Sequence, residues 1–526
     1  MSLFQEEKII INIPAKQRDA SLMAIAFPNI YSVGMASLGF QTAWKLFNQN
    51  EDLKAIRWFT DIEENSGKSG FNARPSYVGF SFSWELDYKN IFSMLEKNNI
   101  PLYSNERGEK DPIIFCGGQV PNANPEPFCD NFDFFLTGDL EEIAEGFINK
   151  IVEIKDLNRE EKLNALAKLD GVYVPSCREQ LRLFPTTKRK TNRGNLTSSS
   201  ILTPNSVWPD TFIVEVVRSC PELCRFCLAS YGSLPFRTPD LKESLIPVID
   251  FGLKHTNKIG LLGASVTQHP EFEGLIEYLN GQNKENKIHV QIASVRADTI
   301  SKNLANGLFE LGAKSITMAV ETGSERLREI INKKVSNQTI TNSIETIYNA
   351  GFKSIKLYGM VGLPHETDSD LKETVNFLKE IKLKNKTKKL VWGSSVFVPK
   401  AGTPFQWYGV DKDAEKKLKY YSKELHQIGV DFRAESYRWS LIQALISRGD
   451  RSINKALVKA YKYGSTLGSF NKALKEEKIN ADYFIFKKWD EKIKLPWDNI
   501  QGFLNKEVIE KHFVTAKRGS EGFYNS

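Results

Sequence analysis

Three of the six cysteines lie within eight consecutive positions, in the segment 218–230: Cys220, Cys224 and Cys227. Thiolates at this density suit a soft metal, and a four-iron cluster normally takes four cysteine ligands. Three ligands leave one iron open, and an open position distinguishes a catalytic metal site from a closed structural one. The C-x3-C-x2-C spacing therefore indicates a catalytic iron–sulfur cluster. The alternative is a zinc site with a distant fourth ligand, either His255 or His269.

The segments around the cysteines indicate how they are positioned. A strand predicted over 211–217 delivers the cysteines as a loop at its carboxyl end, where catalytic residues of parallel barrels gather. Six strand–helix units are predicted between Thr211 and Val398. Six units favour an open, partial (β/α)6 barrel of the TIM type over a closed barrel of eight strands.

The later strand ends of this barrel carry groups that can bind a polar cofactor. One strand ends in Gly263, Ala264 and Ser265, and the next two lead to Ser294 with Arg296 and to Glu321. A carboxylate accepts hydrogen bonds from a ribose or an ammonium group, and a guanidinium pairs with a carboxylate. Two structural alternatives stand beside this interpretation: a solvated ion pair between Arg296 and Asp298, and a helix cap formed by the segment 321–324.

The region before residue 184 alternates predicted strands with helices. Its strands are predicted at 21–27, 77–82, 112–115 and 132–137. This alternation gives a Rossmann-like parallel sheet, whose ligands bind at the carboxyl ends of the strands. The residues at those ends include Ser81, Gly117, Gly118 and Gly138. Glycines there allow a bulky ligand to approach the backbone, although tight turns are the alternative explanation.

Composition divides the α/β chain into four parts: residues 1–183, a linker at 184–210, a core at 211–405 and a mainly helical extension at 406–526. The linker is rich in basic residues and prolines, and we expect it to cross the surface. The net charge of +7 is spread along the chain, so a nucleic-acid partner is not indicated. No apolar run approaches the ~20 residues that span a bilayer, so no membrane partner is expected. Clustered cysteines favour a reducing compartment, the cytoplasm.

The three cysteines, with Phe226 before the last, resemble the signature of the radical S-adenosylmethionine (SAM) superfamily. The resemblance implies a 4Fe-4S cluster whose open iron binds SAM, and an external reductant such as a ferredoxin or flavodoxin. Reductive cleavage would then give methionine and a 5′-deoxyadenosyl radical. It also implies that Phe226 and Gly263–Ser265 position SAM, with Ser294, Arg296 and Glu321 completing its site. Ala264 and Ser265 depart from the family's GGE-like motif, so only a backbone role carries over to them.

Two later segments add to this resemblance. The segment Gly362–Thr367, GLPHET, resembles a late-barrel GLPGET-like element, with His365 where glycine is commoner. The segment Pro399–Phe405 resembles an element near the end of related cores. Helical residues follow, in which Arg448–Arg451 stands out as a substrate-binding segment or, alternatively, a helix-turn ion pair. His426 and His512 are interpreted as packing or surface residues.

The N-terminal region resembles the cobalamin-binding domains that precede some radical SAM enzymes, in FPNIYSVGMASLGFQ and FCGGQVPNANPEPF. An uncharacterised family of radical SAM proteins also has a cobalamin-domain-like N-terminus. The resemblance to that family covers nearly the entire chain. It implies cobalamin at Ser81, Gly117, Gly118 and Gly138, yet no histidine precedes His255 to act as a lower cobalt ligand. Relatives of this kind mostly transfer methyl groups, so methylation of an unknown substrate is expected.

Two alternatives to methylation stay open. The first is a methylthiotransferase acting on RNA or protein, some of which carry a second cluster on three N-terminal cysteines. Cys116, Cys129 and Cys177 would be the candidates here, and buried free thiols are the alternative explanation for them. The second is a non-catalytic iron–sulfur or zinc scaffold.

Overall fold

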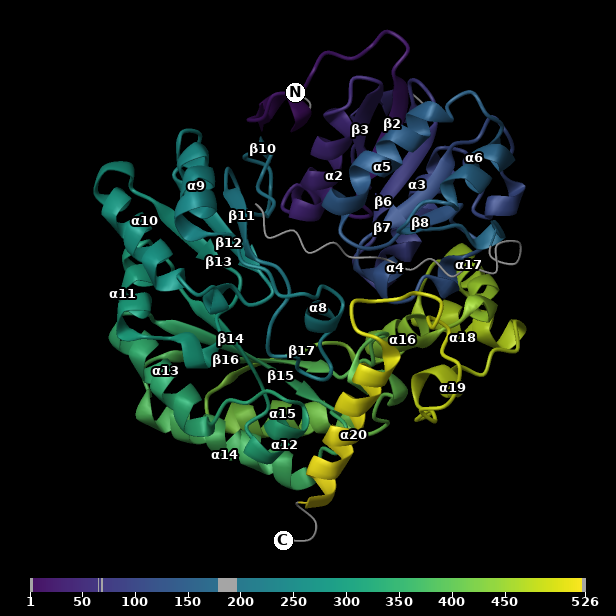
Figure 1. The fold of residues 1–526 in the computed structure, drawn as a ribbon. Helices are drawn as coiled ribbons and strands as arrows, with labels where there is room; N and C mark the ends of the chain where they lie inside the picture. Colours follow the sequence, from purple (N-terminus) through teal and green to yellow (C-terminus); the bar gives the residue numbers. More distant parts are fainter. Residues whose placement is uncertain (1–2, 65, 68–69, 178–195, 523–526) are drawn as a thin grey trace.

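The computed structural model describes residues 3–64, 66–67, 70–177 and 196–522 (Figure 1). Within them lie two parallel sheets, one in each half of the chain, and a group of helices near the C-terminus that contacts both. The α/β class with a Rossmann-like sheet, a partial barrel and a mainly helical extension is confirmed. Among the described residues, no helix is long and apolar enough to cross a membrane.

The N-terminal sheet has six strands in the order β3-β2-β6-β7-β8-β9, of which only β9 runs antiparallel to its neighbour. Its strands are β2 (Ser21–Ala26), β3 (Leu53–Trp58), β6 (Tyr77–Ser81), β7 (Ile113–Gly117), β8 (Phe134–Leu136) and β9 (Val172–Tyr173). The first strand, β2, pairs with β3 on one side and β6 on the other. The order of strands therefore reverses there, which is where doubly wound sheets bind ligands.

Helices cover both faces of this sheet, which explains its nearly continuous apolar strands. Alternate residues of β2 point to opposite faces, so Met23 and Ile25 pack with α2 (Leu38–Asn48) and α5 (Leu140–Glu153). Ala24 packs on the other face, with α3 (Tyr88–Lys97). The four strands predicted here are all present. The sequence reading missed β3 and the short edge strand β9.

The second sheet forms the partial barrel. Its parallel strands are β11 (Phe212–Val217), β12 (Lys258–Gly263), β13 (His289–Ile292), β14 (Ile316–Glu321), β15 (Ser354–Val361), β16 (Lys389–Val396) and β17 (Asp431–Ala434). They form one group of three and one of four strands, joined by a parallel bridge between Val295 and Met318. The six predicted strands are present, and β17 adds a seventh within the region predicted to be helical. It pairs with β16 in parallel, because α15 (Ala414–Gln427) provides the crossover.

Helices lie along the outer face of this sheet, and its inner face is directed toward the centre of the molecule (Figure 1). They are α9 (Ile246–Leu253), α10 (Phe272–Asn286), α11 (Lys302–Glu310), α12 (Glu325–Ile330), α13 (Asn337–Asn349) and α14 (Asp368–Lys384). Side-chain caps at Ser301, Ser324 and Ser336 fix where three of them begin. This arrangement places every strand's carboxyl end at the same rim.

The described part of the predicted linker, residues 196–210, is not a surface crossing. Strand β10 (Ile201–Leu202) pairs antiparallel with β1 (Lys8–Ile9), and both of its residues are buried. Ser199 bonds with Ile213 of β11 through its backbone and its hydroxyl. This segment therefore covers the edge of the barrel sheet, and covering that edge buries the segment. Composition alone does not reveal this contact. Residues 184–195 lie outside the described part of the chain.

The C-terminal helices hold the N-terminal domain against the barrel. They are α16 (Tyr437–Arg448), α17 (Asn454–Lys462), α18 (Leu467–Glu476), α19 (Ala481–Ile485) and α20 (Lys506–Gly522). Asn124 donates to the carbonyls of Ser447 (3.2 Å) and Gly449 (2.8 Å), and Asn454 donates to Pro127 O (2.8 Å). Arg451 pairs with Asp130 at 2.6 Å. These contacts favour a structural role for the segment 448–451.

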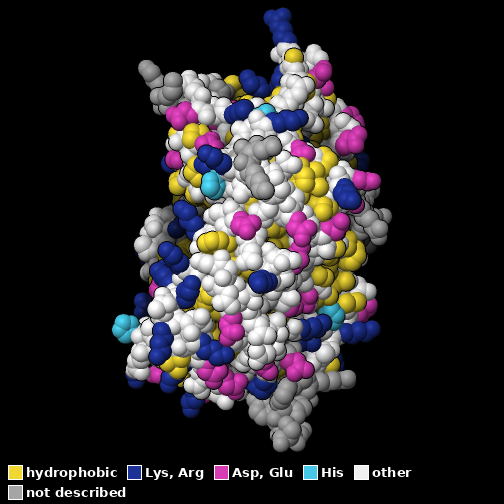
Figure 2. Space-filling model, turned by 90° about the vertical axis from the view of Figure 1, so that its left-hand side faces the viewer, with side chains coloured by type: hydrophobic (Ala, Val, Ile, Leu, Met, Phe, Trp, Pro, Cys, Tyr) yellow, Lys and Arg dark blue, Asp and Glu magenta, His cyan; other side chains and the backbone are white. Residues whose placement is uncertain are grey.

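One face of the molecule shows how its charges are distributed. On the face shown in Figure 2, basic and acidic side chains are interspersed and the described residues form no continuous basic stripe. This agrees with the spread of charge along the sequence.

Replacing Asn124 tests the contact between the domains. Asn124→Ala leaves two buried carbonyls without donors, so we expect the free energy of unfolding to fall by about 1–3 kcal/mol. Urea unfolding followed by tryptophan fluorescence measures it. Asn349→Ala, at an exposed helix end, is the matched control and should change stability by less than about 0.5 kcal/mol. Equal stabilities of the two variants would contradict the bracing role of Asn124.

Candidate active site at the facing strand ends

The cysteine loop follows β11 at the rim of the barrel. Ser219 and Leu223, the residues just before Cys220 and Cys224, have φ angles of 67° and 52°. Residues with side chains adopt this left-handed backbone at a cost of about 1–3 kcal/mol, and such strain is concentrated at functional sites. Cys227 occupies the N-cap of the short helix α8 (Leu228–Tyr231). The loop is thus tightly turned around its cysteines.

The ionisation of Cys224 and Cys227 depends on the other thiols of the loop. The pKa of Cys224 is raised to about 12, mainly by burial; Lys333 lowers it, and the nearby Cys227, Glu321 and Cys220 raise it. Burial also raises the pKa of Cys227. Cys220 Sγ lies 3.4 Å from Gln268 Oε1, and Cys224 Sγ lies 3.7 Å from Asn332 O. A bound metal would displace the protons of its thiol ligands, because coordinating thiols are deprotonated outright.

The described contacts give no support to a zinc site with a distant histidine ligand. No group of three His, Cys, Asp or Glu residues in the described chain is arranged to hold one metal ion. The two histidines considered as fourth ligands make other contacts. Both ring nitrogens of His269 are bonded elsewhere, to Pro239 O (2.7 Å) and Glu271 N (3.1 Å). His255 instead packs edge-on against Phe251.

Arg296 is joined to the cysteine loop through Glu222. Its Nη2 lies 3.2 Å from Glu222 Oε2 and its Nε lies 2.7 Å from Asp298 Oδ1. Glu222 accepts a 2.6 Å hydrogen bond from Gln268, which also contacts Cys220. The ion pair with Asp298 considered from the sequence is present, but the Arg296 side chain is only 7% exposed. The arginine is therefore buried within the site, while its partner Asp298 reaches the solvent.

Glu321 is the last residue of β14. Its backbone is strained, and its buried side chain forms an ion pair. Its φ of 70° is left-handed, and its Oε1 lies 3.1 Å from Lys333 Nζ. Ser324 caps α12, so the helix-cap interpretation of the segment 321–324 also holds. The sequence reading missed Lys333, which affects the ionisation of both Cys224 and Cys227. Its position after α12 in a chain rich in lysine gives no signal that would have found it.

The remaining predicted SAM contacts lie at the same rim. Gly263 ends β12, and a Cβ atom there would lie 2.6 Å from Val217 O, so only glycine allows β11 and β12 to end this close together. Ala264 is exposed, Ser265 is half-buried and Ser294 follows β13. Phe226 packs partly buried against the core. Their roles toward SAM stay predictions.

A cavity of about 530 Å³ lies between the strand ends of the two sheets. The N-terminal domain contributes all four residues predicted to surround a bulky ligand: Ser81, Gly117, Gly118 and Gly138. The barrel contributes Gly263 and Ala264, together with Arg218 and Ser219 just before the first cysteine. The two sets, far apart in sequence, therefore share one cavity.

Local backbone geometry forms the N-terminal wall of this cavity. Gly118 has a φ of 117°, and a Cβ atom there would lie 2.7 Å from Phe82 O. Ion pairs connect the two walls: Arg218 pairs with Glu141 at 2.7 Å, and Arg237 pairs with Asp139 at 2.5 Å. No histidine is among the residues that line the cavity. Glycine backbone thus forms part of the wall of this cavity.

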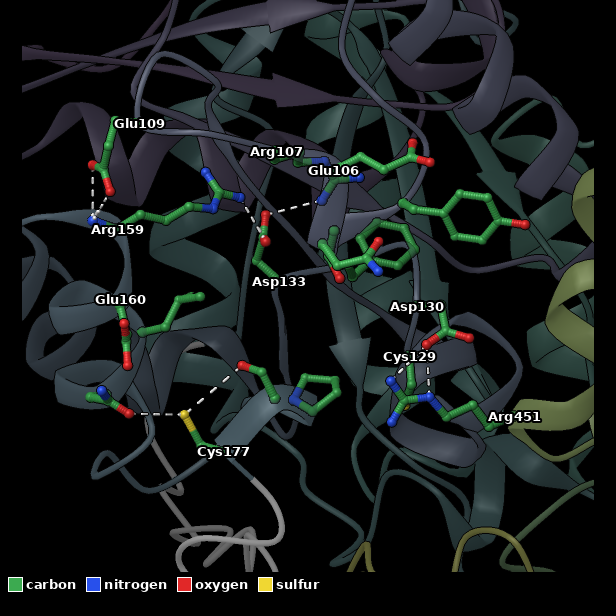
Figure 3. Close-up of a pocket in the computed structure, with 18 of the residues that line it drawn as sticks. Glu106, Arg107, Glu109, Cys129, Asp130, Asp133, Arg159, Glu160, Cys177 and Arg451 are labelled. Atoms are coloured by element: carbon green, nitrogen blue, oxygen red, sulfur yellow. Dashed lines mark hydrogen bonds and ion pairs between the residues drawn. The ribbon is translucent and has the colours of Figure 1, made fainter.

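A second, larger cavity of about 800 Å³ lies at the opposite end of the N-terminal sheet (Figure 3). The buried carboxylate of this cavity is paired: Asp133 lies 3.0 Å from Arg107 and 2.6 Å from Arg159. Figure 3 shows Cys129 and Cys177 on different sides of this cavity. Cys177 contacts Asn164 Oδ1 at 3.2 Å, whereas Cys129 contacts Pro125 O. Cys129, Cys177 and Cys116 are buried thiols outside any disulfide, and the described residues do not bring all three together as a second cluster site.

His365 occupies the position where the related element commonly has glycine. Its φ of 66° is left-handed, which explains the preference for glycine there. His365 Nε2 lies 2.8 Å from the hydroxyl of Tyr408. The imidazole is thus tied to the segment that follows β16.

Comparisons with known proteins agree with this geometry. Residues 39–175 match the family described as radical SAM proteins, N-terminal, and residues 214–378 match the radical SAM superfamily. The chain belongs to the radical SAM superfamily. It is 29% identical over 471 residues to the uncharacterised protein MJ0966 of Methanocaldococcus jannaschii, covering 88% of this chain and 95% of that protein.

Two further relatives cover the chain to different extents. A tRNA-2-methylthio-N(6)-dimethylallyladenosine synthase of Ehrlichia ruminantium is 26% identical over 242 residues, so this chain matches about half (51%) of its length and 42% of its own. The structure of the radical SAM methyltransferase TsrM from Kitasatospora setae, with cobalamin and an iron–sulfur cluster bound, superposes with a TM-score of 0.52 at 9% identity. That superposition covers 87% of this chain and 99% of TsrM, and it shows a shared fold.

Replacing Lys333 tests the charge balance of the site. Lys333→Met leaves the buried Glu321 carboxylate unpaired, so we expect a loss of about 3–5 kcal/mol in the free energy of unfolding. The double variant Lys333→Met with Glu321→Gln should recover most of this loss. Urea unfolding measures both, and Lys334→Met at the exposed neighbouring position is the control. A double variant no more stable than Lys333→Met would refute the pairing.

Proposed function

We propose that this protein is an iron–sulfur enzyme that reductively cleaves SAM and, with cobalamin, transfers a methyl group to an unknown substrate. One observation carries the proposal: the cavity wall contains Arg218 and Ser219, which lead directly into Cys220, and faces Gly117 and Gly118 of the other sheet. A group held on the glycine wall would therefore lie beside the cysteine loop. The superfamily matches over both halves of the chain support the assignment.

The cysteines would hold the cluster, and the charged pairs around them would orient SAM. Cys220, Cys224 and Cys227 would bind three irons and leave the fourth open. SAM carries both an ammonium and a carboxylate, and the rim offers both charges in buried pairs: Glu321 with Lys333, and Glu222 with Arg296. The bound cluster would supply the electron that breaks the sulfonium bond, and the protein would position SAM and exclude water.

The cavity would hold the cobalamin on backbone and small side chains. Gly117, Gly118 and Gly138 leave room beside the strand ends, and Ser81 adds a hydroxyl. Because no histidine precedes residue 255 or lines the cavity, the cobalt would have no histidine ligand from this wall. The methylthiotransferase alternative has less support, since the described N-terminal cysteines do not gather into a second cluster site.

Anaerobic turnover tests the SAM chemistry. Protein reconstituted with iron and sulfide, then given dithionite and SAM, should form 5′-deoxyadenosine, and S-adenosylhomocysteine if SAM also donates the methyl group. Single Cys→Ala substitutions at 220, 224 or 227 should abolish the cluster's visible absorbance, because each removes one of three ligands. Cys177→Ala is the matched control and should retain it. Absorbance surviving a substitution in the loop would refute that ligand.

Gel filtration after incubation with hydroxocobalamin tests the second cofactor. The wild type should emerge with cobalamin absorbance, and Gly118→Ala should retain at least tenfold less, because its Cβ would lie 2.7 Å from Phe82 O and distort the wall. Gly146→Ala, at an open and exposed helix position, is the control and should bind normally. A wild-type protein that emerges colourless would exclude cobalamin while leaving the SAM chemistry intact.

A further inference from the structure

Arg225, between the second and third cysteines, is held by three separate parts of the fold. Its Nε donates to His512 O of α20 at 3.0 Å. Its Nη1 donates to the carbonyls of Glu329 (3.1 Å) and Ile330 (2.5 Å) at the end of α12. Its own carbonyl accepts from Phe405 N at 3.1 Å, in the segment after β16. The residue is only 9% exposed, so its position is fixed.

The C-terminal helix α20 is packed directly on this loop. The hydroxyl of Tyr231 donates to Leu223 O at 3.2 Å and lies 2.8 Å from His512 Nδ1. Phe513 packs against Trp407, with ring centroids 5.0 Å apart. His512 is therefore neither a surface residue nor a simple packing residue, because it contacts the cysteine loop through both its backbone and its ring. In Figure 1, α20 runs beside α12 along the same side of the barrel.

The charge of Arg225 differs from that of the other cations near the loop. Arg218, Arg296 and Lys333 each pair with a carboxylate. Arg225 makes no ion pair within the described residues, and its three guanidinium contacts are all backbone carbonyls. The side chain of Glu329, whose backbone carbonyl accepts from Arg225, is exposed to solvent. A guanidinium stays protonated in proteins, so the loop contains one buried positive charge without a carboxylate partner.

We propose that Arg225 is a positioning residue that raises the reduction potential of the cluster, and that α20 holds its charge in place. The inference rests on the proposed cluster at Cys220, Cys224 and Cys227. Reduction adds one electron from an external donor, and a fixed positive charge stabilises the more negative, reduced form more than the oxidised form. The weak screening of a buried site preserves this effect. Arg225 would thereby make the cluster easier to reduce.

A redox titration of reconstituted protein with dithionite tests this role. At a fixed solution potential, Arg225→Met should lower the ratio of reduced to oxidised cluster about tenfold, which is about 59 mV for a one-electron couple. Arg225→Lys keeps the charge and should stay within about twofold of the wild type. Lys511→Met removes an exposed charge from the same helix and is the control, because solvent screens that charge. Electron paramagnetic resonance of the reduced cluster supplies the ratio.

Each result decides the proposal. An unchanged ratio in Arg225→Met overturns it. If Arg225→Met holds no cluster, the Arg225→Lys variant decides. A wild-type ratio of reduced to oxidised cluster in Arg225→Lys supports the charge role. A tenfold lower ratio in Arg225→Lys, or loss of its cluster, overturns the proposal. A wild-type protein that binds no cluster refutes the proposed function itself, and this is seen before any variant is compared.

Discussion

The close approach of the strand ends of two parallel sheets is the constraint on which the rest of this structure depends. Parallel strands place all their carboxyl ends at one edge, and here two such edges face each other across a single cavity. Within each sheet, the glycines at 118 and 263 let neighbouring strand ends lie close together, since a Cβ atom at either would meet the backbone of the adjacent strand end. The cysteine loop, the buried ion pairs and the cavity all lie where these edges meet.

The helices at the C-terminus fix the position of one sheet edge relative to the other. Asparagine side chains at 124 and 454 satisfy backbone carbonyls across the domain boundary, so sliding one domain would leave buried polar groups unpaired. Further along, α20 reaches back to the cysteine loop and contacts Arg225 and Tyr231. The extension is thus part of the site, although it contributes none of its cysteines.

Charge near the cysteines is arranged in two ways. Arg218, Arg296 and Lys333 are each paired with a carboxylate, as in the contact of Lys333 with the buried Glu321. Arg225 is held by carbonyl dipoles instead. The first arrangement suits a zwitterionic ligand, and the second suits a group whose negative charge increases on reduction.

The sequence by itself determined the class of the fold, the six barrel strands up to Val396 and the loop that carries three cysteines, because spacing and period are local properties of the chain. It also placed glycines at the strand ends of the first domain. Only the tertiary structure brought Gly118 and Gly263 to one cavity, because the distance between two sheets depends on how their helices pack. The same holds for Lys333 beside Glu321 and for His512 against the cysteine loop, since long-range contacts of common residue types carry no signal in one sequence. The strand β17 was missed because four residues are too few to show a period.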